Sequence, residues 1–335
     1  MQRQALRRTA RPTAGDVVVD VHLEQDPARV LNGIRDDLLR TPRQIAPRFF
    51  YDDRGGAFFE QITELPEYYQ TRTEHALLER IADDIARRTR CTALVELGSG
   101  SSAKTRVLLD AMELAGGCQV YVPFDVNEGV VRAAAEELVS SYTGLRVHAV
   151  IGEFMKDLDA IPRPGKRLLI FLGSTIGNLT PREAQRFLVQ LAGVMEPGEF
   201  FLLGVDLIKD VARLETAYND AQGVTAEFNR NILRAINAVA GGDFDPLAYD
   251  HLAFYDTARH WIEMRLVANR DHEVYLPDAG LVLLFRRGDA IRTEISVKYD
   301  PPMTAALLAG AGFDLLSWYP DPENLFGLAL AARRP

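Results

Sequence analysis

A glycine-rich segment, Glu96-Leu97-Gly98-Ser99-Gly100, carries the clearest chemical signal in this sequence. Two glycines two residues apart let backbone N–H groups approach a ligand closely. A short apolar run, Ala93–Leu97, precedes them, and a second apolar run at 118–124 ends in Asp125. An acid at the tip of the second strand is where a nucleoside ribose is held through its two hydroxyls. The spacing therefore predicts a site for a cofactor that carries an adenosine.

The residues around the two glycines bear on which cofactor it is. The dinucleotide fingerprint requires Gly-x-Gly-x-x-Gly, and the third position here is Ala103, a replacement that is sometimes tolerated. Glu96 stands two residues before the first glycine, where an acid favours a ligand with an ammonium group over a pyrophosphate. The pattern resembles the first motif of the S-adenosylmethionine-dependent methyltransferases. A plain strand-to-helix turn remains an alternative for the glycines alone, because short glycine patterns are frequent by accident.

Strands and helices alternate around this motif. Apolar runs predict strands at 93–97, 120–124, 147–151, 167–172 and 199–207, with helices at 104–112 and 127–142 between them. A further helix is expected near Thr180, which has Glu183 at capping-box spacing. Because this alternation implies right-handed crossovers, the expected fold class is α/β, a Rossmann-like methyltransferase fold with a mostly parallel sheet. Ligands then bind beyond the carboxyl ends of the strands.

The alternation stops after Asp206. A long helical stretch is expected at 210–240, followed by antiparallel strands at 261–268, 272–277, 280–285 and 290–299. We therefore predict a cofactor-binding domain of residues 1–205 and 300–335, with an N-terminal helical cap, and an inserted α+β substrate domain of residues 206–299. A helix at 303–311 and a hairpin of 313–319 and 326–332 are expected to return to the first sheet. Thr71 and Glu74 predict a second capping box, ahead of a helix at 74–88.

Composition narrows the class of partner. The chain has 335 residues and a net charge of −9, which argues against a surface that follows nucleic-acid phosphates. No apolar run approaches the length needed to cross a bilayer, so no membrane partner is expected. Cys91 and Cys118 have no His or Cys companion at metal spacing. We expect reduced thiols, no metal site and a cytoplasmic protein.

Further segments, taken with the glycine motif, resemble the histidine Nα-methyltransferases of ergothioneine biosynthesis. These segments are Phe50-Tyr51-Asp52, Leu65-Pro66-Glu67-Tyr68-Tyr69, Thr71-Arg72-Thr73-Glu74, Pro123-Phe124-Asp125, Phe171-Leu172-Gly173-Ser174-Thr175-Ile176-Gly177-Asn178 and Phe228-Asn229-Arg230-Asn231. The resemblance extends from about Pro47 to the C-terminus. It implies a monomer that methylates the α-amino group of L-histidine with S-adenosylmethionine, three times, to give the trimethyl betaine hercynine.

On the cofactor side, the resemblance implies that the backbone at Gly98 approaches the methionine part and that Lys104 pairs with its carboxylate. Asp125 would bind the ribose. Glu153 and Phe154 would contact the adenine, although the family has Asp where this chain has Glu153. Without the resemblance, Lys104 also fits a solvated helix lysine, and Phe154 fits a core residue.

On the substrate side, the resemblance implies that Asn178 and Tyr218 bind the backbone end of the amino acid. Tyr68 would contact substrate and cofactor together. Tyr51 would lie at the amine, and either Tyr51 or a bound water is the candidate proton acceptor. Tyr51 and Asn178 are therefore the expected catalytic residues. Taken alone, Asn178 fits a helix cap and Tyr218 an aromatic packing residue.

Glu294 and Ser296 carry the argument for histidine. Residues two apart on a strand face the same side, so both can point into one pocket while Ile295 packs behind them. An acid and a hydroxyl on one face can bind both nitrogens of an imidazole. The resemblance makes Met264 the apolar wall of this pocket. An edge strand with outward polar residues would show the same pattern.

Three other functions are compatible with parts of the sequence. One is the same chemistry on another amino acid such as tryptophan. An indole and an imidazole differ in their polar groups, so Glu294 and Met264 are the positions that discriminate between these substrates. A nicotinamide-dependent oxidoreductase and a non-catalytic sensor of an adenosyl ligand would share only the glycine motif and Asp125.

Overall fold

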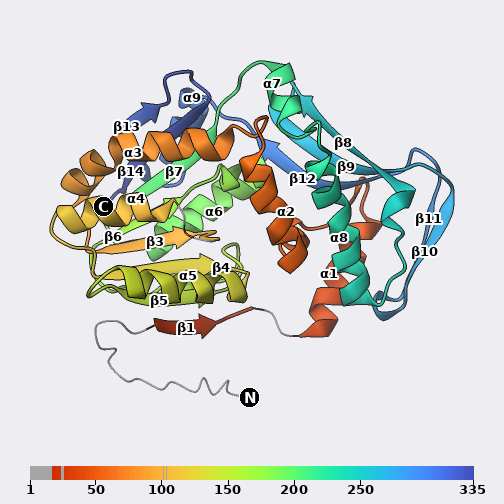
Figure 1. Cartoon of the computed structure of the whole chain (residues 1–335), viewed down its shortest axis with the longest axis horizontal. Helices are drawn as coiled ribbons and strands as arrows, with labels where there is room; N and C mark the ends of the chain where they lie inside the picture. Colours follow the sequence, from red (N-terminus) through yellow and green to blue (C-terminus); the bar gives the residue numbers. More distant parts are fainter. Residues whose placement is uncertain (1–16, 24–25, 101, 103) are drawn as a thin grey trace.

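The computed structural model describes residues 17–23, 26–100, 102 and 104–335. Its two lobes lie side by side (Figure 1). One lobe is built on an eight-stranded sheet, and the other on a four-stranded and a two-stranded sheet. Ser101 and Ala103, which follow the glycine motif in the sequence, lie outside the described residues.

The eight-stranded sheet has the strand order β1-β5-β4-β3-β6-β7-β14-β13. Pairing is parallel from β1 through β7, whereas β14 is antiparallel to both β7 and β13. This mostly parallel sheet confirms the expected Rossmann-like α/β fold and the closing hairpin. The strand bounds are β1 (Val17–Val21), β3 (Ala93–Leu97), β4 (Val120–Asp125), β5 (Arg146–Ile151), β6 (Arg167–Phe171), β7 (Phe200–Asp206), β13 (Phe313–Pro320) and β14 (Phe326–Arg333).

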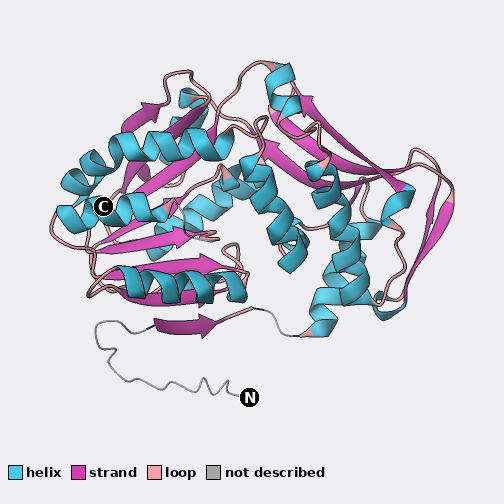
Figure 2. Cartoon of the chain, viewed as in Figure 1, coloured by secondary structure: helices cyan, strands magenta, loops and turns pink. Residues whose placement is uncertain are grey.

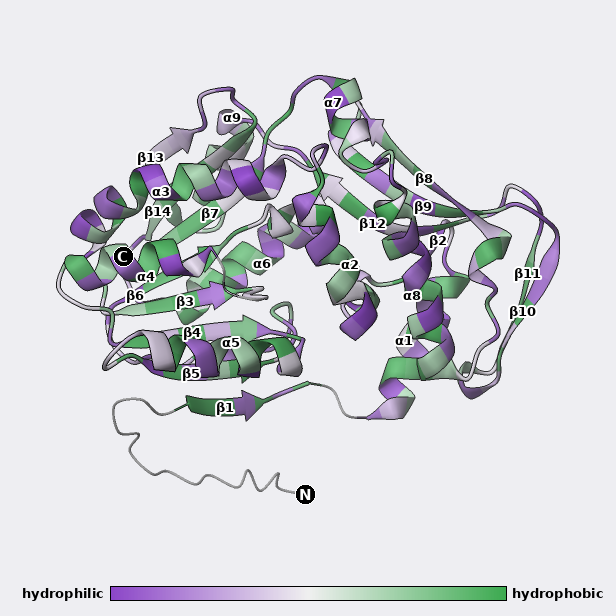
Figure 3. Ribbon diagram, in the orientation of Figure 1, coloured by the Kyte–Doolittle hydropathy of each residue, from purple (hydrophilic) through white to green (hydrophobic). Residues whose placement is uncertain are grey.

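Helices cover both faces of this sheet (Figure 2). Alternate residues of β3 point to opposite faces: Leu94 packs in the cluster that contains α3, α4 and α5, and Val95 packs in the cluster that contains α6 and α9. Along α3, hydrophilic and hydrophobic residues alternate, as expected of a helix with one buried side (Figure 3). The helix bounds are α3 (Gln70–Thr89), α4 (Thr105–Leu114), α5 (Glu128–Ser141), α6 (Pro181–Val194) and α9 (Pro301–Gly310).

One of the two expected capping boxes is present. Thr180 and Glu183 form both reciprocal hydrogen bonds at the start of α6, with Pro181 as the first helical residue. The box expected at Thr71 and Glu74 is wrong, because α3 already begins at Gln70 and has no side-chain cap. The Glu74 carboxylate is instead fully buried, four residues after the first residue of the helix.

The second lobe follows β7 and contains the antiparallel strands expected there. The strand β8, at 249–256, was not expected from the sequence. In the four-stranded sheet the order is β2-β12-β9-β8, and β10 pairs with β11 as a separate hairpin. The element bounds are α7 (Val211–Thr216), α8 (Val224–Ala240), β8 (Tyr249–Asp256), β9 (Trp261–Ala268), β10 (His272–Leu276), β11 (Leu281–Phe285) and β12 (Ala290–Val297).

The N-terminal segment packs against the second lobe. The short strand β2 (Arg43–Gln44) pairs in parallel with β12. The helices α1 (Pro27–Leu39) and α2 (Asp53–Glu64) and the 3-10 turn η1 (Pro47–Phe50) contribute side chains to the same hydrophobic core as α8. This packing places residues 27–64 with the substrate lobe, although the sequence assigned them to the cofactor-binding domain. The domain boundaries at residues 205 and 300 stay a proposal.

In the part of the chain that the structure describes, no helix is both long and apolar enough to span a membrane.

Candidate functional site

The two lobes meet at the carboxyl ends of the parallel strands. After β6 the chain forms a 3-10 turn, η3 (Thr175–Asn178), which packs against β12 of the second lobe. A Cβ atom on Gly177 would lie 2.8 Å from the carbonyl oxygen and 3.1 Å from the nitrogen of Val297. Because glycine has no such atom, the two backbones can approach, and this places Asn178 at the junction. Among the described residues, no side-chain hydrogen bond engages Asn178, so its amide is available to a ligand.

The glycine motif and Asp125 lie together, as the sequence predicts. Gly98 and Gly100 both have positive φ angles, +69° and +48°, which explains why glycine occupies these positions. The Asp125 carboxylate accepts hydrogen bonds from the backbone N–H groups of Gly100 (2.9 Å) and Asn127 (3.0 Å). The acid is therefore fixed beside the turn, at the end of β4.

Glu96 lies beneath this turn and is almost completely buried. Its Oε2 atom accepts hydrogen bonds from the hydroxyls of Thr105 and of Tyr121 (2.5 Å). Burial raises the pKa of Glu96 to about 7. These bonds tie the glycine strand to the start of α4, and the expected contact of Glu96 with an ammonium group stays a prediction.

Glu74 is a site residue that sequence reasoning missed. Its buried carboxylate accepts from the backbone N–H of Gly173 (2.8 and 2.9 Å to the two oxygens) and from the ammonium of Lys104. Gly204 on β7 leaves room for it, because a Cβ there would lie 2.3 Å from Glu74 Oε1. Lys104 is thus held over the carboxyl end of β6. The sequence signal was present in Glu74, but its spacing from Thr71 suggested a helix cap.

Two buried polar side chains near the glycine turn and α3 have no partner among the described residues. Both amide atoms of Gln70, one helical turn before Glu74, and the Ser99 hydroxyl form no hydrogen bond there, although these residues are only 3% and 7% exposed. Buried polar groups in native proteins are nearly always paired, with protein, water or ligand. These orphaned atoms, the left-handed glycines and Asp125 together fit a ligand with several polar groups, such as S-adenosylmethionine.

The residues expected at the adenine have other contacts in the structure. Glu153 forms ion pairs with Arg48 of η1 (2.7 Å) and with Lys156 (2.9 Å). Phe154 lies edge-on to Phe171 and Phe187, with ring centroids 5.2 and 5.5 Å apart, and remains partly exposed. Glu153 therefore bridges the N-terminal segment and the first lobe, and adenine contacts of both residues stay predictions.

The three expected tyrosines come together between the lobes. The ring of Tyr68 lies edge-on to that of Tyr218, with centroids 6.5 Å apart, and to Phe59 at 6.3 Å. Tyr51 lies edge-on to Phe59 at 6.1 Å. Burial raises the pKa of Tyr51, and the nearby acids Glu294 and Asp125 raise it further. Tyr51 is thus near both Asp125, the acid expected at the ribose, and Glu294, the acid expected at the substrate. Its hydroxyl stays protonated.

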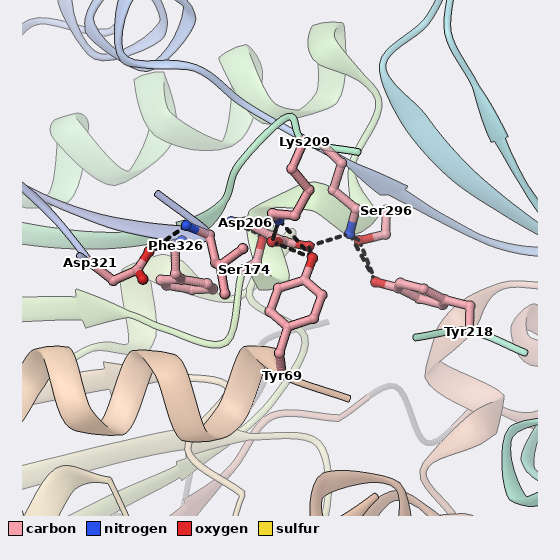
Figure 4. Close-up of polar contacts among 10 residues, drawn as sticks. Tyr69, Ser174, Asp206, Lys209, Tyr218, Ser296, Asp321 and Phe326 are labelled. Carbon is pink, nitrogen blue, oxygen red and sulfur yellow. Dashed lines mark hydrogen bonds and ion pairs between the residues drawn. The ribbon is translucent and has the colours of Figure 1, made fainter. Parts of the chain in front are cut away.

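Tyr218, Ser296 and Asp206 belong to one network of polar contacts (Figure 4). Lys298 Nζ donates to the Tyr218 hydroxyl (3.0 Å) and to Ser296 Oγ (2.8 Å), and it forms an ion pair with Asp206 (2.8 Å). The Tyr218 hydroxyl also donates to Ser296 Oγ (2.9 Å). Lys298 and Asp206 are fully buried. Neither was identified from the sequence as a site residue, because both types are normally exposed.

The Asp206 carboxylate also contacts the side chains of Lys209 and Tyr69. Lys209 donates to the carboxylate and to the Tyr69 hydroxyl (2.6 Å), and that hydroxyl bonds to Asp206 at 2.9 Å. Burial lowers the pKa of Lys209 to about 8. Burial alone would raise the pKa of Asp206, but Lys298 and Lys209 outweigh it and lower the pKa. With one carboxylate and two ammonium groups, this network carries a net positive charge at neutral pH.

Glu294 and Ser296 lie on one face of β12, as expected. Ile295 and Val297, which alternate with them, pack into the core of the first lobe. Glu294 is opposite Met264 of β9, which is almost completely buried. Burial raises the pKa of Glu294 to about 7, against the opposing effect of Lys298.

The Phe228-Asn229-Arg230-Asn231 segment holds two of the tyrosines in place. Asn231 donates to Asp52, the neighbour of Tyr51, at 2.8 Å. Asn229 donates to His251 Nδ1 (2.9 Å), and His251 Nε2 bonds to the backbone carbonyl of Tyr218 (2.9 Å). Burial lowers the pKa of His251, which keeps the ring neutral and suited to these two bonds.

Comparison with known proteins assigns the chain to a family. A family model described as "Histidine-specific methyltransferase, SAM-dependent" matches residues 28–333. The chain belongs to this family. The histidine-specific methyltransferases use S-adenosylmethionine, so the cofactor expected from the glycine motif and Asp125 is confirmed.

Relatives of known name agree with the family. The histidine N-alpha-methyltransferase of Mycobacterium tuberculosis is 45% identical over 95% of this chain and 99% of its own length. That of Mycolicibacterium smegmatis is also 45% identical, over 90% and 94%. The ergothioneine biosynthesis protein 1 of Neurospora crassa is 32% identical over 87% of this chain and 33% of its own length. The recognised resemblance to histidine-specific methyltransferases is thereby confirmed.

The solved structures found by comparison are more distant in sequence. A methyltransferase from Clostridium acetobutylicum is 9% identical with a TM-score of 0.48, over 83% of this chain and 98% of that chain. Within the described residues, no cluster of three His, Cys, Asp or Glu side chains could hold a metal ion.

Proposed function

We propose that this protein methylates the α-amino group of L-histidine three times to give hercynine, the first step of ergothioneine biosynthesis. The observation that carries the proposal is the pair Glu294 and Ser296 on one face of β12, opposite the apolar wall of Met264. An acid and a hydroxyl at this spacing suit the two nitrogens of an imidazole. An indole has a single N–H and would leave one of these groups unpaired.

The backbone end of the substrate is assigned to Tyr218 and Asn178. Tyr218 belongs to a network of one carboxylate and two ammonium groups, whose net positive charge favours a carboxylate ligand. Asn178 offers an amide at the junction of the lobes. Tyr68, whose ring lies edge-on to Tyr218, is assigned to both substrate and cofactor, and its position beside Tyr218 supports this.

The cofactor is assigned to Gly98, Lys104, Asp125, Glu153, Phe154 and Tyr68. S-adenosylmethionine, when bound, supplies an electrophilic methyl group on a sulfonium. Asp125, held by two backbone N–H groups, is a ready acceptor for ribose hydroxyls. Lys104, held by Glu74, is the cation for the methionine carboxylate. Glu153 would have to share its carboxylate between Arg48, Lys156 and the adenine.

The attacking amine must be neutral, and its ordinary pKa is about 8 in peptides. Tyr51 does not act as its base, because burial and neighbouring acids keep the hydroxyl protonated. Tyr51 instead orients the amine, and a water carries the proton away. Because no His or Lys of the described residues stands out as a strong base, catalysis depends mainly on positioning, which can supply up to roughly 7–11 kcal/mol.

The test is methyl transfer from S-adenosylmethionine to a panel of free amino acids, followed by mass spectrometry. Histidine should gain three methyl groups, with the mono- and dimethyl forms accepted as substrates, and tryptophan should gain none. Methylation of tryptophan with no gain by histidine would refute the proposal.

The remaining expectations concern the state of the protein. We propose a cytoplasmic monomer in which residues 206–299 form the substrate domain. Sedimentation or light scattering gives the mass in solution, and a stable dimer would contradict the monomer.

A further inference from the structure

Lys298 lies directly behind two side chains assigned to the substrate. It follows Ser296 by two residues and is fully buried. Its Nζ atom contacts Asp206 Oδ2 (2.8 Å), the Tyr218 hydroxyl (3.0 Å) and Ser296 Oγ (2.8 Å). An ammonium has three N–H donors and no acceptor. These three contacts therefore use all of its hydrogen-bonding capacity.

The lysine restricts where the two hydroxyl hydrogens can point. Because an ammonium only donates, the oxygens of Tyr218 and Ser296 must accept on the side of Lys298. Ser296 Oγ accepts a second hydrogen bond from Tyr218 (2.9 Å). No contact among the described residues uses the hydrogen of Ser296 near the substrate face, so Ser296 can donate to a ligand. Ser296 stays free to donate even when the hydroxyl hydrogen of Tyr218 points to a substrate carboxylate instead of to Ser296.

We propose that Lys298 is a positioning residue that makes Ser296 a donor to an unprotonated ring nitrogen and Tyr218 a donor to the substrate carboxylate. Glu294, on the same face of β12, then accepts from the other ring nitrogen. The site thus takes the imidazole as one neutral tautomer. This inference rests on the proposed function, since it assigns hydrogen-bond directions to the histidine site.

Asp206 and the surroundings of Glu294 complete the arrangement. Asp206 compensates the buried ammonium, which would otherwise be costly to keep charged. Glu294 lies near the hydroxyls of Tyr51, Tyr68 and Tyr218, whose pKa it helps to raise, so these hydroxyls stay uncharged. Lys298 is the cation that favours the Glu294 carboxylate. One lysine therefore supports both the donor and the acceptor that face the imidazole.

The first experiment replaces Lys298 by Met and, separately, by Gln, which fills similar space with an uncharged amide. The KM for L-histidine should rise about 10- to 100-fold, as expected for the loss of a charge-assisted hydrogen bond. The acidic limb of the kcat/KM profile for histidine should move to higher pH, because Glu294 loses its cation. Cofactor affinity by calorimetry should be retained. Lys166→Met is the matched control, since Lys166 donates to the Thr89 carbonyl outside this network.

The second experiment is a double-mutant cycle with Ser296→Ala and Lys298→Met. If Lys298 acts through Ser296, the double variant should lose at least about tenfold less in kcat/KM than the product of the single losses. Ser296→Ala alone should raise the KM without moving the acidic limb, because serine carries no charge.

The outcomes separate this inference from the proposed function. The inference alone would be refuted if the unaltered protein methylates histidine but both Lys298 variants keep its KM for histidine and the acidic limb of its kcat/KM profile. It would also be refuted if the kcat/KM losses of Ser296→Ala and Lys298→Met simply multiply in the double variant. No methylation of histidine by the unaltered protein would refute the proposed function and the inference with it.

Discussion

Gly177 and Val297 are in backbone contact across the two lobes, with no space for a side chain between them. The gap is so narrow that a single added carbon would lie 2.8 Å from the Val297 carbonyl oxygen. This contact joins η3, which carries Asn178, to the strand that carries Glu294 and Ser296. The distance between the cofactor-binding lobe and the substrate-binding strand β12 therefore depends on Gly177.

Gly177→Ala should disturb activity more than stability. The added methyl group must push η3 away from β12, at a cost of about 1–3 kcal/mol in unfolding free energy. We expect a lower melting temperature and a loss of kcat/KM for histidine of at least about tenfold, because positioning errors near 1 Å are severe. Thermal melts and initial rates measure both.

Gly193→Ala is the matched control for this variant. Gly193 lies in α6, is exposed and has open space where the methyl group would go. Alanine there should stabilise the helix by about 0.5–1 kcal/mol and leave the rates unchanged. Equal kinetic parameters for Gly177→Ala and the unaltered protein would contradict the role given to the backbone contact.

Glu74→Gln should weaken cofactor binding. The amide keeps the shape of the side chain but removes the charge that holds Lys104. We expect the calorimetric Kd for S-adenosylmethionine to rise about tenfold or more, with a smaller effect on the KM for histidine. Glu79→Gln, in the exposed part of the same helix, should change neither value. A cofactor Kd that is the same in both variants would show that Glu74 is only structural.

Glu294→Gln should remove one pH dependence of histidine binding. Burial raises the pKa of Glu294 to about 7, so its carboxylate forms as pH rises through that value. The kcat/KM for histidine should rise through the same range in the unaltered protein, beyond the change due to the substrate's own imidazole and amine. In the variant the KM should be higher and only the substrate's ionisations should remain. Identical profiles for the two proteins would contradict the assignment.

The same carboxyl should cost stability at alkaline pH. Its pKa is higher in the folded state than its ordinary value of 4.5, so the folded state binds the proton more tightly. Stability from this group is complete below about pH 4.5 and is lost as pH rises through about 7. The pKa shift sets an upper limit of about 3 kcal/mol on this loss of unfolding free energy. The actual loss is smaller, because the side chain keeps some solvent contact. Glu294→Gln should therefore melt at a higher temperature than the unaltered protein at pH 8.

Asn231→Ala should impair histidine methylation through Tyr51. The variant loses the hydrogen bond to Asp52, the residue beside Tyr51. We expect about 1–3 kcal/mol of destabilisation and a clear rise in the KM for histidine. Asn237→Ala, on the same helix, loses its bonds to the Phe244 backbone and should destabilise to a similar degree with an unchanged KM. A parallel KM change in both variants would point to general loosening.

The first lobe could be predicted from sequence because its strands are continuous apolar runs. Strands buried on both faces, such as β3 and β6, stand out against any background. The missed strands are β1, β2 and β8. β1 is a short valine run with Asp20 that is only partly buried at the edge of the sheet. β2 has two residues and depends on β12 far along the chain, and the apolar residues of β8 are interrupted by Asp250 and His251.

The site could be predicted only where its residues belong to a recognisable motif. Asp125 and the glycines share a local geometry that their spacing reveals. Lys298, Asp206 and Glu74 were missed because each is a buried charge whose partner lies elsewhere in the chain. No local pattern distinguishes such residues from the exposed lysines and acids that most sequences contain.

The pairing of β2 with β12 has a consequence for synthesis of the protein. Gln44 and Arg292, which join these strands through a side-chain bond, are 248 residues apart. As the polypeptide leaves the ribosome, β2 therefore cannot pair until almost the whole chain has been made, and α1 and α2 cannot pack until α8 has been made. The parallel sheet can assemble in the meantime, apart from its last two strands. Nascent chains stalled before α8 should thus expose the apolar sides of α1 and α2 to chaperones.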